Sequence, residues 1–167
     1  AVEFAEAHSK EYIAGLRLGI TTDTQDITGN VLRAALPALQ SISENDLKSV
    51  ICEFTGDIQQ IPPMYSAIKV NGKKLYELAR KGESVERKPR SVNISRLELV
   101  GREEADFILD VCCSKGTYIR TLCNDIGDRL GCGGCMSSLR RIKAGAFSVT
   151  EAHSVEEIVQ NPEKYVL

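Results

Sequence analysis

The sequence predicts an α+β fold in which a mixed, mostly antiparallel sheet is flanked by helices. Two observations lead to this prediction: segments with a strand pattern outnumber segments with a helical pattern, and the connections between them are short. With 167 residues, the chain fits one domain spanning 1–167. A domain of this length buries roughly 70% of its unfolded surface, enough for a sizeable core.

The first third of the chain predicts a strand, a loop and a helix. Apolar and small residues alternate over 12–18, which is typical of a strand with one buried face. Residues 21–29 are polar and rich in turn formers, so we expect a long loop. Ser43 to Asp46 resembles a capping box, and it predicts a helix that ends at Gly56.

The middle third contains a proline pair and many cations. Pro62 and Pro63 predict an extended entry to residues 64–70, and Asn71-Gly72 predicts a turn. A short helix is expected over 73–81, followed by a charged linker over 83–90.

The last third predicts further strands and helices. We expect strands over 92–100 and 107–113, a helix from about 118 to 130, a short helix over 136–141, a strand over 142–149 and a last helix capped by Ser154.

Residues 113–121, reading C-S-K-G-T-Y-I-R-T, are the most informative stretch. A turn at 114–116 separates the buried strand from the helix, so Arg120 falls in the first helical turn. The helix dipole disfavours a cation there by roughly 0.3–1 kcal/mol. Either an anionic partner lies nearby, or Arg120 is a solvated side chain tolerated at a helix start.

The formal net charge is −2, but the basic residues are concentrated in two segments. Residues 69–90 carry eight Lys or Arg and three Asp or Glu, and residues 115–143 carry six and two. These segments could form a phosphate-binding face, or they could be ordinary solvated surfaces.

The six cysteines raise the question of a metal or redox site. Cys132 and Cys135 have the spacing of half a zinc site, and Cys112-Cys113 could complete it. Adjacent cysteines are poor co-ligands, because side chains on a strand point to opposite faces. We expect structural thiols in a reducing cytosol, with no metal and no cofactor. No membrane-spanning run and no signal peptide are evident.

Seven blocks of the sequence, in order, resemble the TruB-type tRNA pseudouridine synthases. They are Lys10-Glu11-Tyr12, Leu18 to Asp26 with Gly29, Phe54-Thr55-Gly56, Gln60 to Lys69, Gly72 to Tyr76 with Ala79-Arg80, Cys113 to Thr121, and Leu130 to Gly133 with Leu139-Arg140-Arg141. The resemblance covers most of the chain, from about Lys10 to Phe147, and implies part of a pseudouridine synthase fold.

The resemblance also implies a catalytic set. Tyr12 corresponds to the tyrosine that stacks on the flipped base, Arg120 to the arginine that pairs with the catalytic aspartate, and Leu139 to an apolar residue against the uracil. From the sequence pattern alone, Tyr12 and Leu139 are core residues. Asp23 is expected to pair with Arg120 or to contact RNA, although a turn-capping role is an equal alternative.

The expected partner is the T-arm of tRNA, bound through cations and aromatic rings. The candidate contacts are Tyr65, Lys69, Lys73, Lys74, Tyr76, Arg80, Tyr118, Arg140 and Arg141.

The family's Gly-x-Leu-Asp-Pro loop, which carries the nucleophilic aspartate, does not occur in these residues. We therefore expect a central piece of a synthase catalytic domain, without the C-terminal RNA-binding domain and inactive alone. A cytoplasmic monomer is expected. Two alternatives are a non-catalytic tRNA-binding or chaperone-like relative and a zinc- or thiol-dependent module built on Cys132 and Cys135.

Overall fold

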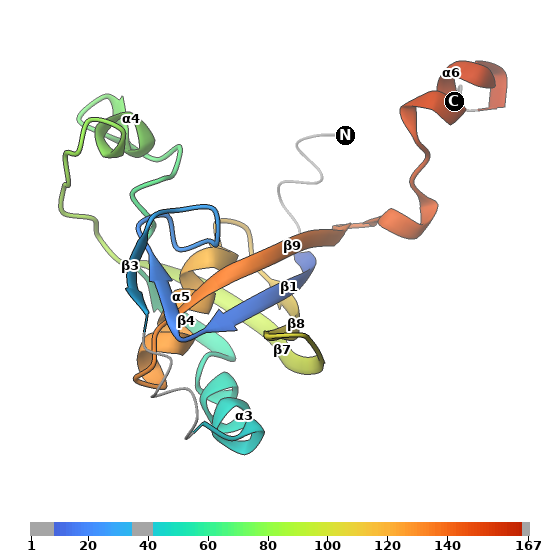
Figure 1. The fold of residues 1–167 in the computed structure, drawn as a ribbon. Helices are drawn as coiled ribbons and strands as arrows, with labels where there is room; N and C mark the ends of the chain where they lie inside the picture. Colours follow the sequence, from blue (N-terminus) through green and yellow to red (C-terminus); the bar gives the residue numbers. More distant parts are fainter. Residues whose placement is uncertain (1–8, 35–41, 165–167) are drawn as a thin grey trace.

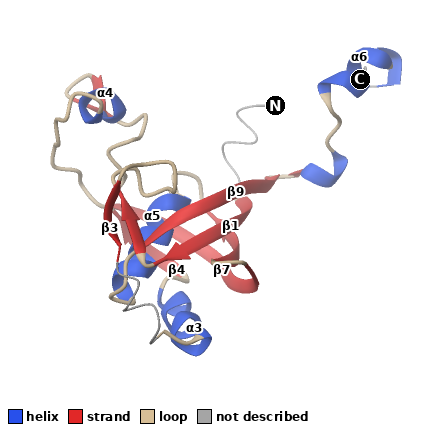
Figure 2. Cartoon of the chain, in the orientation of Figure 1, coloured by secondary structure: helices blue, strands red, loops and turns tan. Residues whose placement is uncertain are grey.

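The computed structural model describes residues 9–34 and 42–164, which form a six-stranded antiparallel sheet with helices against one face (Figures 1 and 2). The strand order is β10-β9-β1-β8-β7-β4. The strands are β1 (Lys10–Leu18), β4 (Gly56–Gln60), β7 (Arg90–Glu103), β8 (Asp106–Cys113), β9 (Gly134–Ala144) and β10 (Phe147–Ser148). The predicted α+β class is confirmed.

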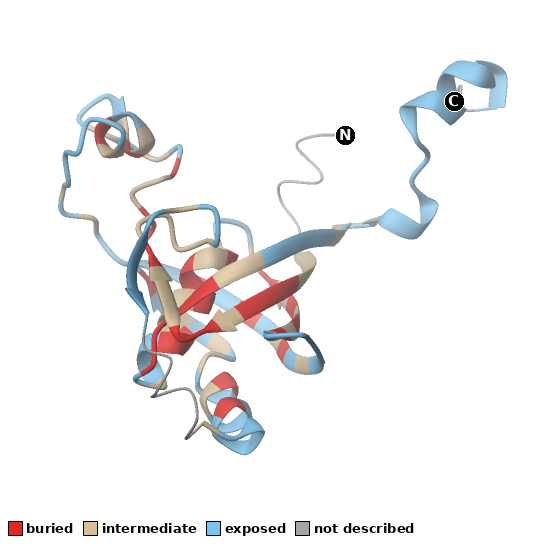
Figure 3. Cartoon of the chain, viewed as in Figure 1, coloured by how far each residue is buried: buried red, intermediate tan, exposed pale blue. Residues whose placement is uncertain are grey.

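The core lies between the sheet and two helices, α3 (Glu44–Glu53) and α5 (Ile119–Arg129). Strand β1 alternates as predicted, and β8, expected to be mostly buried, alternates as well. Both strands turn residues such as Leu16 and Leu109 inward, where both are fully buried. Figure 3 shows the buried residues gathered where α5 meets the sheet. The helices pack on this apolar face because removing it from water stabilises the fold.

The opposite face of the sheet is polar. Arg96 on β7 bonds to Glu11 on β1 at 3.2 Å and to Asp110 on β8 at 3.0 Å. Glu11 also lies 3.5 Å from Lys143 on β9. These pairs link four adjacent strands across a face that needs no covering helix.

The segment 61–89, which we call the 61–89 extension, leaves the sheet after β4 and returns at β7. It contains a short hairpin, β5 (Lys69–Val70) and β6 (Lys73–Lys74), and the helix α4 (Leu75–Ala79), which stands away from the sheet in Figure 1. The expected helix over 73–81 begins later than predicted. Asn71 and Gly72 both have positive φ, 51° and 80°, as a tight hairpin turn requires, so the two lysines pair as a strand instead.

The expected short helix over 136–141 is wrong, because these residues belong to β9. Strand β9 pairs with β1 from Leu18 to Lys10, and this long-range pairing overrides a local sequence that lacks a strong strand preference.

The expected strand over 142–149 is divided into two strands by a turn. Gly145, with φ 59°, turns the chain after Ala144, so β10 folds back on β9.

Both predicted capping boxes are confirmed. Ser43 accepts a hydrogen bond from the amide of Asp46 at the start of α3, and Ser154 accepts one from Glu157 at the start of α6 (Val155–Gln160). Helix α6 follows a 3-10 turn, η1 (Val149–Glu151), and precedes another, η2 (Pro162–Lys164). This segment extends far from the sheet and is exposed throughout (Figure 3).

Helix α5 can pack closely on the backbone of residues 133–134 because residue 127 is a glycine. A Cβ added there would overlap the backbone of Gly133 and Gly134. We expect Gly127→Ala to lower the free energy of unfolding by about 1–3 kcal/mol, because the backbone must shift to make room. Urea denaturation followed by circular dichroism measures this change. The control is Gly101→Ala on β7, where no atom lies within 4 Å of the added Cβ and stability should hold or rise. Equal stability of the two variants would contradict the packing argument.

Candidate active site

A polar loop over residues 23–29 lies against the start of β9. It connects β2 (Ile20–Thr22) to β3 (Val31–Ala34), which pair with each other. The amide of Ile27 donates to the carbonyl of Met136 at 2.8 Å, and the amide of Met136 donates to the carbonyl of Gln25 at 3.0 Å. These backbone bonds fix the predicted loop in place beside the sheet.

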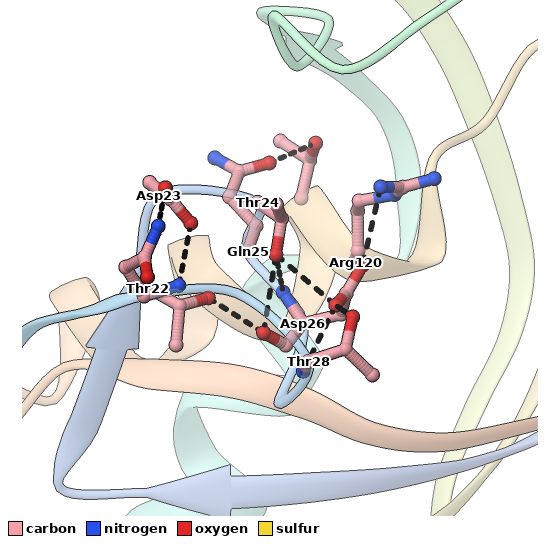
Figure 4. A network of polar contacts seen from close by, with 9 residues as sticks. Thr22, Asp23, Thr24, Gln25, Asp26, Thr28 and Arg120 are labelled. Carbon is pink, nitrogen blue, oxygen red and sulfur yellow. Dashed lines mark hydrogen bonds and ion pairs between the residues drawn. The ribbon is translucent and has the colours of Figure 1, made fainter. Parts of the chain in front are cut away.

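The carboxylate of Asp26 is the centre of the polar network in Figure 4. It accepts hydrogen bonds from the hydroxyl of Thr24 at 3.0 Å and from the amide of Thr28 at 3.1 Å. It also accepts one from the Thr28 hydroxyl, at 2.5 Å. Burial raises the pKa of Asp26, but the bonds from Thr28 and Thr24 and the charge of Arg120 outweigh it, so the pKa is lowered overall.

Arg120 lies in the first turn of α5, as predicted, and its guanidinium contacts the Asp26 carboxylate at 3.2 Å. The side chains are 30% and 17% exposed, so the pair is partly shielded from water. The anionic partner that the helix dipole argument required is therefore present. The expectation that Asp23 would supply it is wrong: Asp23 accepts bonds from the amide and side chain of Asn30, at 2.8 and 2.9 Å, and caps the turn between β2 and β3.

Two glutamines hold the start of α5. The hydroxyl of Thr121 donates to the side chain of Gln25 at 2.7 Å, which ties the helix to the 23–29 loop. Gln60, only 2% exposed, accepts from the amide of Tyr118 at 2.8 Å and donates to its carbonyl at 3.1 Å. Tyr118 is the N-cap residue of α5, so these two bonds hold the helix at its first turn. The alternative of a freely solvated Arg120 does not fit a helix start held on both sides.

Tyr12 is half-buried on the face of the sheet that α5 covers. It packs on the apolar cluster that contains Ile119, the neighbour of Arg120, so the two predicted site residues lie on one side of the sheet. Burial raises the pKa of Tyr12 and the nearby Cys113 adds to this, while Arg141, its partner on β9, lowers it.

Leu139 lies on β9 directly opposite Ala14 and is 45% exposed. The expectation of a core leucine, drawn from the pattern alone, is therefore wrong. Its exposure leaves an apolar surface beside Tyr12 that a flat ring could contact.

Eight of the nine candidate RNA contacts lie in two groups, and the ninth, Tyr118, lies at the start of α5. In the 61–89 extension, Lys74 and Arg80 lie over the ring of Tyr76, at 5.4 and 5.3 Å from its centre. Lys69 and Lys73 are exposed on the hairpin, and Tyr65 is half-buried. The second group, Arg140 and Arg141, is exposed on β9.

The two cysteines with the spacing of half a zinc site lie inside the protein. Cys132 and Cys135 are both buried, and burial raises the pKa of Cys135 to about 11. Within residues 9–34 and 42–164, no group of three or more His, Cys, Asp or Glu could hold a metal. In the same ranges, no helix is long and apolar enough to cross a membrane.

Asp26 should make stability depend on pH on the acid side. A lowered folded-state pKa contributes stability above the ordinary value of 3.8, and this contribution is lost as the pH falls through the folded value. We expect Asp26→Asn to lower the free energy of unfolding by about 1–3 kcal/mol at pH 7, with the difference shrinking below about pH 4. Urea titrations between pH 3 and 7 test this. Glu98→Gln, which removes an exposed carboxylate of β7, is the control. A constant difference at every pH would rule out a role for ionised Asp26.

Two family models match the chain. Residues 1–119 match the TruB family pseudouridylate synthase (N terminal domain), and residues 120–165 match the tRNA pseudouridylate synthase B C-terminal domain. The boundary between the matches falls inside α5, and β9 in the second match pairs with β1 in the first.

Curated relatives agree with these matches. The tRNA pseudouridine synthase B of Alkaliphilus oremlandii is 48% identical over 95% of this chain and 52% of the relative. That of Clostridium kluyveri is 45% identical over all of this chain and 58% of the relative. The chain thus spans about half the length of the relatives it matches.

Solved structures share the fold. A chain of the crystal structure of a Cbf5-Nop10-Gar1 complex superposes with a TM-score of 0.67 at 28% identity, covering 95% of this chain and 37% of that one. These matches, together with Tyr12 and the Arg120–Asp26 pair on one side of the sheet, lead to a single conclusion: the chain belongs to the TruB family of pseudouridylate synthases.

Proposed function

We propose that this chain forms the central part of a tRNA pseudouridine synthase that isomerises a uridine in the T-loop of tRNA. The chain spans about half of its relatives, so the activity is that of an enzyme which contains it. We further propose that this enzyme works as a cytoplasmic monomer and needs no cofactor.

The reaction rearranges one base without adding or removing atoms overall. The bond between N1 of uracil and C1′ of ribose breaks, and a bond between C5 and C1′ forms. The proton on C5 leaves, and N1 gains a proton. The base must leave its stack, which costs a few kcal/mol, and a pocket must hold it.

The single observation that carries this proposal is the partly buried Arg120, held by Asp26 at the start of a helix. A guanidinium has five N–H donors, and the bond to Asp26 uses one. The remaining donors can hold a second carboxylate, the nucleophile or base, in its ionised form. In this role Arg120 is a catalytic residue and Asp26 is a positioning residue.

Tyr12 and Leu139 are suited to hold the uracil. Tyr12 offers an aromatic face on the side of the sheet that α5 covers, and the exposed Leu139 offers an apolar surface from the neighbouring strand. Stacking on such surfaces offsets part of the free energy that is lost when the base leaves its neighbours in the RNA. The cations of the 61–89 extension, with Arg140 and Arg141, would contact the phosphates of the T-arm.

Replacing Arg120 tests the catalytic role. In the enzyme that contains this chain, we expect Arg120→Ala to lower turnover by about 10²–10³-fold or more, because the charge that holds the carboxylate ionised is lost. Affinity for tRNA should stay within about twofold. Tritium release from tRNA carrying 5-tritiated uridine measures turnover, since C5 loses its hydrogen.

The control for this experiment is Arg129→Ala, at the other end of the same helix, where the arginine pairs with the exposed Glu53. It should leave turnover unchanged. An Arg120→Ala enzyme that retains turnover would refute the assigned role, and RNA binding without pseudouridine formation by the wild type would favour the non-catalytic alternative.

Replacing Lys73 and Lys74 tests the extension as a tRNA contact. Each phosphate contact contributes about 0.7–0.9 to the slope of log affinity against log salt. We expect Lys73→Gln with Lys74→Gln to reduce that slope by about 1.5, as measured by fluorescence anisotropy between 50 and 200 mM salt. The double variant Lys48→Gln with Arg102→Gln removes two charges elsewhere and is the control. An unchanged slope would mean that the two lysines only face solvent.

A further inference from the structure

We propose that a second cationic site, distinct from the residues assigned above, binds the phosphates of the RNA strand next to the target nucleotide. We call it the β1–β7 pocket. It is a hollow of about 500 Å³ lined by Lys10, Arg90, Ser91, Val92, Lys115 and Gly116. The proposal rests on the proposed function, because it takes the ligand to be the RNA substrate.

The sheet topology brings these residues together from distant parts of the sequence. Cys113, the last residue of β8, pairs with Lys10 at the start of β1 and with Ile94 near the start of β7. Lys115 follows two residues later, in the turn that leads to α5. The amide of Ser114 donates to the carbonyl of Asn93 at 2.8 Å, which fixes this turn beside β7.

The three cations of the pocket have no acidic partner in the part of the chain that the structure describes. Among the described residues, no carboxylate lines the pocket, and Lys10, Arg90 and Lys115 form no ion pair. Glu11 lies next to Lys10 in sequence but pairs with Arg96 and Lys143. Three like charges on one concave surface repel one another and attract an anion strongly.

Other arginines of the chain do have carboxylate partners. Arg17, Arg96 and Arg129 each contact an aspartate or glutamate. A cation with a carboxylate partner contributes little to binding a polyanion, because its charge is already balanced. Many other lysines and arginines of the described residues also lack an ion pair, and the three of the β1–β7 pocket differ from them in lining one hollow together, where their charges can act on one ligand.

The neighbouring hollow indicates that the ligand is a strand. Arg90 also lines a cavity of about 260 Å³, whose other charged lining residues are Lys69, Arg87, Lys88 and one carboxylate, Glu86. The two hollows share this arginine, so the basic surface continues from the extension to the end of the sheet. A linear polyanion can follow such a surface, whereas a small phosphate compound would occupy only one hollow.

The position of Lys10 relates the pocket to the candidate active site. Lys10 and Tyr12 are two residues apart on β1 and point to the same side, so they are separated by about 7 Å along the strand. A phosphate bound by Lys10 therefore lies within one nucleotide of a base stacked on Tyr12. The pocket would fix the backbone while the base is extruded.

A matched pair of double variants tests the pocket. Arg90→Gln with Lys115→Gln removes two charges from it. Lys48→Gln with Arg102→Gln removes one lysine and one arginine elsewhere; Lys48 lies on α3, and Arg102 lies about 40 Å along β7 from Arg90. All these residues except Lys10 are exposed, so the variants should fold.

The measurement is the affinity of the full chain for tRNA by fluorescence anisotropy between 50 and 200 mM salt. We expect the pocket variant to reduce the salt slope by about 1.4 and to weaken binding about tenfold at 50 mM salt, and Lys10→Gln alone to reduce the slope by about 0.7. The control variant should change the salt slope and the affinity at 50 mM salt by no more than about a third of these amounts. A pocket variant that matches the control would overturn the proposal.

Two further comparisons complete the test. One distinguishes an RNA strand from free phosphate as the ligand, and the other distinguishes failure of this inference from failure of the proposed function. A single-stranded oligouridine should compete with tRNA for the wild type more weakly after the pocket charges are removed, and inorganic phosphate should not compete at equal phosphate concentration. Equal competition by inorganic phosphate would overturn the strand assignment. If the wild type binds tRNA and the pocket variant is unaffected, only this inference fails. If the wild type does not bind tRNA at all, the proposed function fails with it.

Discussion

The ion pair between Arg120 and Asp26 is the interaction on which the candidate site depends. It joins the helix α5 to a loop that has little regular structure of its own, and neither element alone would place a guanidinium at this point. The helix dipole opposes a cation in the first turn, and the carboxylate compensates for it. Thr24 and Thr28 bond to the same carboxylate, so the anion is held in position before any substrate arrives.

The sheet serves two separate purposes on its two faces. One face carries the apolar residues that pack on α3 and α5 and so supply most of the stabilisation. The other face carries cross-strand ion pairs centred on Arg96 and Glu11 and is satisfied without a covering layer. Because the core lies between the sheet and the helices, the start of α5 and the exposed end of β9 are free to form a site.

Local signals in the sequence predicted much of the fold. The capping serines, the alternation of β1, and the place of Arg120 in a helix start depend on neighbouring residues, so a pattern can reveal them. The strand over 134–141 was missed because its conformation depends on pairing with β1, more than one hundred residues away. The partner of Arg120 was misassigned for a related reason: Asp23 and Asp26 lie in the same polar loop, and only the folded loop shows which one faces the helix. Gln25 and Gln60 lie within the family-like blocks, but no local pattern assigns them a role, because a glutamine that bonds to a distant residue looks like any surface glutamine in the sequence.

The burial of most cysteines determines which thiol reacts first with an electrophilic reagent. Four of the six cysteines are buried and Cys112 is intermediate, while Cys52, on α3, is exposed. Burial raises the pKa of Cys113 and Cys135 to about 11, so few thiolate anions exist there at neutral pH to attack an alkylating reagent. A maleimide dye should therefore attach first to Cys52, on a helix that contributes no residue to the candidate site.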